Sequence, residues 1–67
     1  MKHEIAELNL TVKTYNVLKR AGINCLEDIC DKTPNELRKT RNLGTKSYKE
    51  ILSKLEEYGL KLKEETL

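Results

Sequence analysis

The feature that constrains this chain most is a polar turn leading into its longest amphipathic segment. The turn reads Arg41-Asn42-Leu43-Gly44-Thr45-Lys46-Ser47, and the segment continues to Tyr58. Apolar side chains recur there at the i, i+3, i+4 and i+7 spacing of one helical face, with charged residues opposite. The pattern predicts a helix from Lys46 to Tyr58 that begins at the turn and packs one face against a core. The residues of that face are Tyr48, Ile51, Leu52 and Leu55.

The start of this predicted helix is a candidate anion site. The first backbone N–H groups of a helix lack intrahelical acceptors, and the helix dipole makes that end positive. Gly44 leaves the backbone open to approach, Lys46 adds a charge and Ser47 adds a hydroxyl. This set fits a phosphate of a nucleic-acid backbone better than a catalytic centre. The same residues are also ordinary at helix starts that bind nothing, so the turn alone does not decide between the two interpretations.

Charge is distributed unevenly along the 67 residues, a length that supports one small domain with a thin core. Residues 11–54 contain ten basic and five acidic side chains, whereas the two ends together contain three basic and six acidic ones. A basic centre suits a domain that contacts a polyanion. Lys13, Asn16 and Arg20 also recur along one side of a predicted helix, a stripe that a solvated face would equally explain.

The sequence offers little for catalysis, metal binding or membrane insertion. His3 is the only histidine and is expected to be solvated. Cys25 and Cys30 are expected to be buried thiols, because their shared helical segment lacks disulfide geometry and further zinc ligands. No carboxylate pair marks a cleft, and no apolar run approaches the ~20 residues of a membrane span. We expect a soluble, cytoplasmic, non-enzymatic protein with no catalytic residue, cofactor, metal or small-molecule substrate.

Cap and stop signals predict three further helices, all shorter. The first runs from a Thr11 cap to about Ala21 and ends at a glycine suited to the left-handed position after a helix. The second covers Cys25 to Asp31 behind an Asn24 cap, and the third begins at Thr33-Pro34-Asn35-Glu36, a capping-box pattern. The residues expected to point inward from the first helix are Val12, Tyr15, Leu18 and Ala21.

No segment has the alternation or β-branched content of a strand. We therefore predict an all-α fold, a compact bundle of four short helices plus an N-terminal arm. The turns Gly22-Ile23-Asn24 and Asn42-Leu43-Gly44 each lead into a helix, which is typical of helix-hairpin-helix-like (SAM-like) folds. Residues 1–7 are expected to be a linker stub, 8–62 the domain and 63–67 a charged tail.

Two separated motifs resemble the carboxy-terminal domain of the bacterial RNA polymerase alpha subunit. They are Leu10 to Asn24 and Arg41 to Ser47, and the similarity covers about Glu7 to Leu62. The resemblance implies a helical module of DNA-directed RNA polymerase that binds the minor groove of A/T-rich promoter DNA. It also implies docking on transcription activators, on the sigma factor and on the rest of the polymerase, in the nucleoid-associated part of the cytoplasm.

By position, the resemblance also implies functional residues. The DNA-facing set is Lys13, Asn16, Val17, Gly44, Lys46, Ser47 and Glu50, with Glu50 orienting donors rather than touching DNA. The protein-docking set is Glu7, Tyr15, Lys19, Pro34, Asn35 and Glu36, although Tyr15 fits a core position equally well. Lys13 stands where the family usually has arginine, so we expect weaker binding and less preference for A/T tracts.

An alternative function fits the same fold. A free-standing helical protein-interaction module with weak or no DNA binding would share these motifs. Lys13 favours this alternative, whereas Gly44, Lys46 and Ser47 together favour DNA binding. The sequence leaves open whether the chain is part of a polymerase subunit or a free-standing relative.

Overall fold

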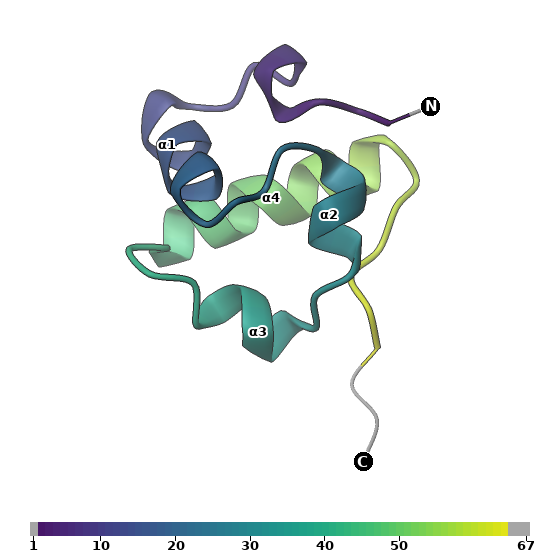
Figure 1. Ribbon diagram of the computed structural model, residues 1–67. Helices are drawn as coiled ribbons and strands as arrows, with labels where there is room; N and C mark the ends of the chain where they lie inside the picture. Colours follow the sequence, from purple (N-terminus) through teal and green to yellow (C-terminus); the bar gives the residue numbers. More distant parts are fainter. Residues whose placement is uncertain (1, 65–67) are drawn as a thin grey trace.

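Helices account for all the regular elements of the structure. The computed structural model describes residues 2–64 (Figure 1). One turn of 3₁₀ helix, η1 (Ile5–Glu7), precedes four α-helices. These are α1 (Val12–Arg20), α2 (Leu26–Cys30), α3 (Pro34–Arg38) and α4 (Thr45–Glu57). The only strand-like pairing among the described residues is one antiparallel β-bridge between Glu4 and Cys25. The predicted all-α fold is confirmed.

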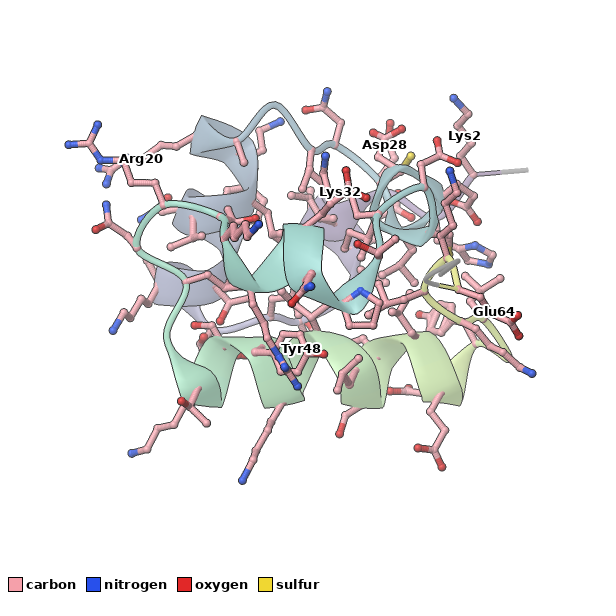
Figure 2. The ribbon with its side chains drawn as sticks, turned by 90° about the horizontal axis from the view of Figure 1, so that it is seen from below. Lys2, Arg20, Asp28, Lys32, Tyr48 and Glu64 are labelled. Atoms are coloured by element: carbon pink, nitrogen blue, oxygen red, sulfur yellow. The ribbon has the colours of Figure 1, made fainter. Side chains whose placement is uncertain are left out.

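The longest helix, α4, crosses the width of the molecule (Figure 1), and Figure 2 shows it along one edge, with the other helices packed on one side of it. Its buried side chains are Ser47, Ile51 and Leu55, and Tyr48 is half-buried beneath the Arg38 guanidinium, 5.0 Å from the ring centroid. The core draws apolar side chains from every element, namely Ile5, Leu8, Leu18, Ile23, Leu26, Ile29, Leu37, Ile51 and Leu55. Leu52, expected to point inward, is 36% exposed because it lies at the rim of the buried stripe.

The N-terminal segment is packed onto the domain. Ile5 and Leu8 are buried in the core. The Ile5 amide donates to the Asn24 carbonyl at 3.0 Å, and the Leu26 amide donates to the His3 carbonyl at 2.8 Å. The packed structure therefore begins at about His3, ahead of the expected boundary at residue 8. Of the expected tail, residues 65–67 lie outside the described part of the sequence.

His3 is exposed, as expected, but it also contacts two other parts of the fold. Its Nδ1 lies 2.8 Å from Glu27 Oε2, and its backbone amide donates to Glu27 Oε1 at 2.8 Å. The imidazole also meets the Tyr58 ring edge-on, with centroids 4.7 Å apart. The side-chain hydrogen bond with His3, followed by the bond from its amide, lowers the pKa of Glu27 to about 2. His3 thus links the N-terminal segment to α2 and to the end of α4.

The predicted start of α3 and stop of α1 are confirmed. Thr33 and Glu36 form both halves of a capping box, with the Thr33 amide donating to Glu36 Oε1 at 3.0 Å. After α1, Gly22 adopts φ +78°, where a Cβ would be strained. The Ile23 amide then donates to the Leu18 carbonyl at 2.9 Å, which completes the helix-ending motif.

The predicted start of α2 is wrong by one residue. Cys25, not Asn24, occupies the N-cap position, and its thiol makes no capping hydrogen bond. The Asn24 side chain instead accepts from Lys19 Nζ at 2.9 Å. Asp28 Oδ2 accepts from the Asn24 amide at 3.2 Å and so helps to hold the start of α2. The bridge between Cys25 and Glu4 explains the shift, because it keeps Cys25 extended.

The inward face of α1 also differs from the prediction. Val12 is 75% exposed and Ala21 is exposed, because the buried face is formed by Thr14, Val17 and Leu18. The prediction counted only apolar residues, whereas a threonine occupies one of the buried positions. Tyr15 is half-buried and packs against the core from the side.

Candidate nucleic-acid interface

A groove lies between the beginning of α1 and the beginning of α4. Its lining residues are Thr11, Lys13, Gly44, Thr45, Lys46, Ser47 and Glu50. Five of the seven residues expected to face DNA are among them, although α1 and α4 are far apart in the sequence. We call this groove the α1–α4 groove. The fold therefore joins the basic stripe of α1 to the polar turn before α4.

The start of α4 presents backbone donors to this groove. Gly44 is the N-cap in an extended conformation (φ −82°, ψ 174°) and provides no side-chain acceptor. The Tyr48 amide makes the first bond of the helix, to the Gly44 carbonyl at 3.0 Å. The amides of residues 45–47 precede it and have no acceptor within the helix. A Cβ at Gly44 would meet nothing within 4 Å, so packing does not require glycine there.

Glu50 fixes α4 against the beginning of α1. Its carboxylate accepts from the Thr11 amide at 2.7 Å, from Thr11 Oγ1 at 2.9 Å and from Thr14 Oγ1 at 2.7 Å. Desolvation is the largest single influence and raises the pKa of Glu50, but these hydrogen bonds together outweigh it and leave the pKa below its ordinary value. Glu50 is thus held as an anion, and its carboxylate binds hydrogen-bond donors at the beginning of α1.

Ser47 faces inward rather than toward the groove. The residue is 5% exposed, and its hydroxyl lies 2.9 Å from the hydroxyl of Thr14, which is itself 1% exposed. Ser47 can therefore offer its backbone amide at the helix start, while its side chain holds α4 to α1. Lys46, by contrast, is exposed beside the groove, where its ammonium can meet an anion.

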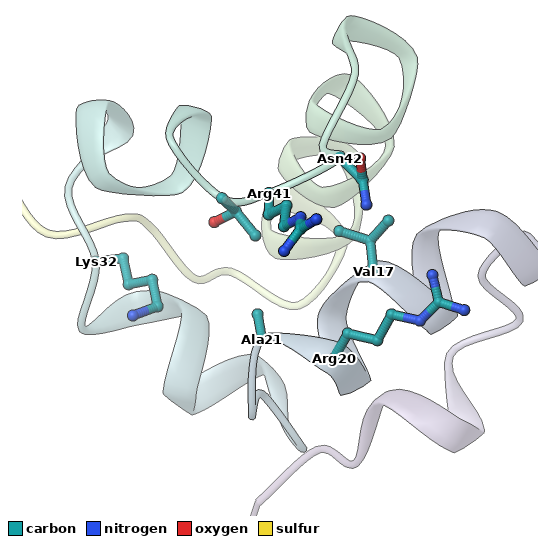
Figure 3. A pocket seen from close by; sticks show the side chains of 7 residues that line it. Val17, Arg20, Ala21, Lys32, Arg41 and Asn42 are labelled. Carbon is teal, nitrogen blue, oxygen red and sulfur yellow. The ribbon is translucent and has the colours of Figure 1, made fainter.

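Asn16 and Val17 continue the α1 surface away from this groove. Asn16 is exposed, whereas Val17 is 5% exposed and contributes to the floor of a second hollow. That hollow lies between the end of α1, the α2–α3 connection and the turn before α4 (Figure 3). We call it the cationic hollow. Its lining residues are Val17, Arg20, Ala21, Lys32, Thr40, Arg41 and Asn42.

Sequence reasoning did not assign the three cations of this hollow to a site. Arg20 was visible as the last member of the α1 stripe, and Arg41 as the first residue of the polar turn. Lys32 carried no signal, because only the fold brings the α2–α3 connection beside the other two. The cationic hollow extends the basic surface along the whole length of α1.

The residues expected to dock proteins lie apart from the α1–α4 groove. Lys19 Nζ sits 6.0 Å from the Tyr15 ring centroid, on the side of α1 opposite Lys13. Glu7 is exposed at the end of η1. Pro34, Asn35 and Glu36 form the first turn of α3, where Glu36 is engaged in the capping box. The structure therefore places these residues in separate patches. One of them, the Tyr15–Lys19 patch, lies on the side of α1 opposite its basic face.

Other classes of site receive no support from the described residues. No group of three His, Cys, Asp or Glu side chains among them could hold a metal ion. None of the described helices is long and apolar enough to cross a membrane. Cys25 is buried as expected, whereas Cys30 is only half-buried, and both are free thiols. Burial, followed by the charges of Glu27 and Asp31, raises the pKa of Cys30.

Comparison with known proteins points to one family. The family model for the C-terminal domain of the bacterial RNA polymerase alpha subunit matches residues 1–57. Similar curated relatives are named DNA-directed RNA polymerase subunit alpha. Identity is 56% over 61 residues in Malacoplasma penetrans, 52% over 65 in Oenococcus oeni and 51% over 61 in Bacillus velezensis. These alignments include 91%, 97% and 91% of this protein but 18%, 21% and 19% of the relatives. The sequence thus spans about a fifth of their length.

Proposed function

Because the protein belongs to the family of C-terminal domains of bacterial RNA polymerase alpha subunits, we propose that it acts in transcription as a DNA-binding and regulator-docking domain. Its DNA ligand would be the minor groove of A/T-rich DNA upstream of promoters. Its protein partners would be transcription activators, the sigma factor and the rest of the polymerase. Under this proposal the domain itself performs no catalysis.

One observation carries the proposal for DNA. The α1–α4 groove combines three backbone donors at the start of α4 with the ammonium groups of Lys13 and Lys46. Backbone amides at a helix start bind phosphate without reading base sequence, and a nearby lysine adds charge. Lys13, on the other wall, would reach into the narrow and electronegative minor groove of an A/T tract.

Glu50 has a positioning role in this arrangement. A carboxylate next to a phosphate would normally oppose binding, but that of Glu50 accepts three hydrogen bonds from Thr11 and Thr14. These bonds fix the beginning of α1 relative to the beginning of α4. Lys13 and Lys46 are therefore held on opposite walls of one groove before DNA arrives, which lowers the ordering cost of binding.

Protein docking would use the patches away from the groove. The Tyr15–Lys19 patch lies behind the basic face of α1, so a regulator could contact it while DNA occupies the front. The first turn of α3 offers Pro34, Asn35 and the exposed edge of Glu36 as a second surface. Glu7 is the candidate for the sigma factor. Simultaneous contact with DNA and protein is what a promoter-recognition domain requires.

The test is the salt dependence of DNA binding by a Lys46→Ala variant. Loss of one phosphate contact should make the slope of log K against log salt shallower by about 0.9 and should weaken binding similarly on all sequences. Lys61→Ala is the matched control, because this exposed lysine lies beyond the end of α4 and outside the groove. Identical slopes for the two variants would remove Lys46 from the interface. A folded wild-type domain that binds no DNA at low salt would favour the protein-interaction alternative.

A further inference from the structure

The cationic hollow brings together three basic side chains from three different parts of the fold. Arg20 comes from the end of α1, Lys32 from the α2–α3 connection and Arg41 from the turn before α4, and they surround Val17 and Ala21 (Figure 3). Among residues 2–64, which the structure describes, no Asp or Glu lines the hollow. Among the described residues, the two salt bridges are His3–Glu27 and Lys54–Glu57, so neither neutralises these cations.

Three cations around one hollow give it a positive potential. Such a potential attracts an anion to the hollow. Two of the three cations are arginines, whose planar guanidinium groups suit the paired oxygens of a phosphate. Thr40 and Asn42 add neutral polar groups to the lining, while Val17 and Ala21 contribute apolar surface. The hollow therefore has the chemistry of a subsite for a phosphodiester.

Its position connects it to the α1–α4 groove. The α1–α4 groove lies at the beginning of α1, against the first turns of α4, and the cationic hollow lies at the end of α1, against the connection from α3 to α4. Lys13 and Arg20 are seven residues apart, which corresponds to about 10 Å along a helix. This span exceeds the width of a minor groove, about 6 Å. If α1 lies across the minor groove with Lys13 inside it, the far end of the helix would reach the sugar-phosphate backbone.

We propose that the cationic hollow is a second phosphate-binding subsite, which receives the DNA backbone on the side of the minor groove away from the beginning of α4. The subsite rests on the proposed DNA-binding function and extends it by naming Arg20, Lys32 and Arg41 as phosphate contacts. DNA would then be held at both ends of α1, and Lys13 and Asn16 between them would be oriented toward the base edges.

The test compares two double variants that lose the same charge. Arg20→Gln/Arg41→Gln removes two cations of the hollow, and Lys2→Gln/Lys61→Gln removes two exposed cations elsewhere. Lys2 lies at the opposite end of the molecule from Arg20 (Figure 2). Fluorescence anisotropy with an A/T-tract duplex gives K over a series of salt concentrations, and circular dichroism verifies that each variant is folded. Lys32→Gln is a single substitution that tests the same hollow with minimal change.

For the hollow variant we expect severalfold weaker binding at low salt and a slope shallower by about 0.9, the value for one phosphate. The control should keep the wild-type slope. Lys32→Gln should also weaken binding and make the slope shallower, by less than the hollow variant does. Equal slopes for the two double variants would overturn the subsite. If Lys46→Ala still makes the slope shallower in that case, the proposed DNA binding is supported and only the second subsite is refuted. Failure of the wild-type domain to bind DNA would overturn both.

Discussion

Replacement of Glu50 by alanine should destabilise the domain although Glu50 lies at its surface. The substitution removes the acceptor of hydrogen bonds at 2.7, 2.9 and 2.7 Å from Thr11 and Thr14. Hydrogen bonds to a charged group contribute roughly 1.5–3 kcal/mol each when buried, and they are not additive. Thr11 is exposed and can donate to water instead, whereas Thr14 is 1% exposed and keeps only contacts with other hydroxyls, Ser47 at 2.9 Å and Thr11 at 3.1 Å. We expect a loss of about 2 kcal/mol.

The assay is thermal unfolding followed by circular dichroism at pH 7. For a domain of this size, a loss of about 2 kcal/mol lowers Tm by roughly 8–16 °C. The pKa of Glu50 is depressed in the folded state, so its contribution is present above the ordinary carboxyl pKa and is lost as the pH falls. The Tm difference between wild type and variant should therefore shrink in acid.

Glu56→Ala provides the control for this measurement. Glu56 is an exposed glutamate of the same helix, and substitutions of this kind change stability by about 0.5 kcal/mol or less. A Glu50→Ala variant as stable as Glu56→Ala at pH 7 would refute the account of the α1–α4 connection. A Tm difference that grows as the pH falls would refute the assigned direction of the pKa shift.

Three further predictions test the groove and the N-terminal contact. Gly44→Ser should raise Tm slightly, because serine caps a helix a little better than glycine and open space surrounds this position, yet it should weaken DNA binding by covering the free amides; tighter binding would contradict their role. Lys13→Arg should strengthen binding to an A/T-rich duplex more than to a G/C-rich one, because guanidinium is weakly hydrated and suits a narrow groove; equal gains would refute this. An NMR titration should give Glu27 a pKa of about 2, rising toward the ordinary range in His3→Ala; the stability linked to this group is present at neutral pH and is lost as the pH falls toward 2.

The parts of the fold that depend on local chemistry could be predicted from the sequence. The Thr33–Glu36 capping box and the Gly22 stop each involve only a few consecutive residues, and both are confirmed. The resemblance to the polymerase alpha domain depended on two motifs, Leu10 to Asn24 and Arg41 to Ser47, each of which can be recognised from consecutive residues. The family assignment is confirmed as well.

The parts that depend on tertiary contacts could not be predicted. An apolar pattern placed Val12 inside α1, whereas the buried position is held by Thr14, whose hydroxyl is satisfied by Ser47 and Glu50 from α4. Asn24 was an ordinary cap signal, but a bridge to the N-terminal segment keeps Cys25 extended, so that Cys25 is the N-cap and α2 begins at Leu26. In each case a partner distant in sequence changed the role of a polar residue.

Contacts between residues distant in sequence also limit what could be predicted about the candidate nucleic-acid interface. Lys13 and Lys46 each had a local signal, and the fold brings them to one groove. The cationic hollow had no such signal for Lys32, because three separate elements supply its charges.

The most direct test of the central claim is a salt titration of the wild-type protein with an A/T-tract duplex and a G/C-rich duplex of equal length. The account predicts tighter binding to the A/T duplex, with log K falling linearly as log salt rises. Equal affinity for the two duplexes would contradict minor-groove recognition. No binding to either duplex by a folded sample at low salt would contradict DNA binding by this domain.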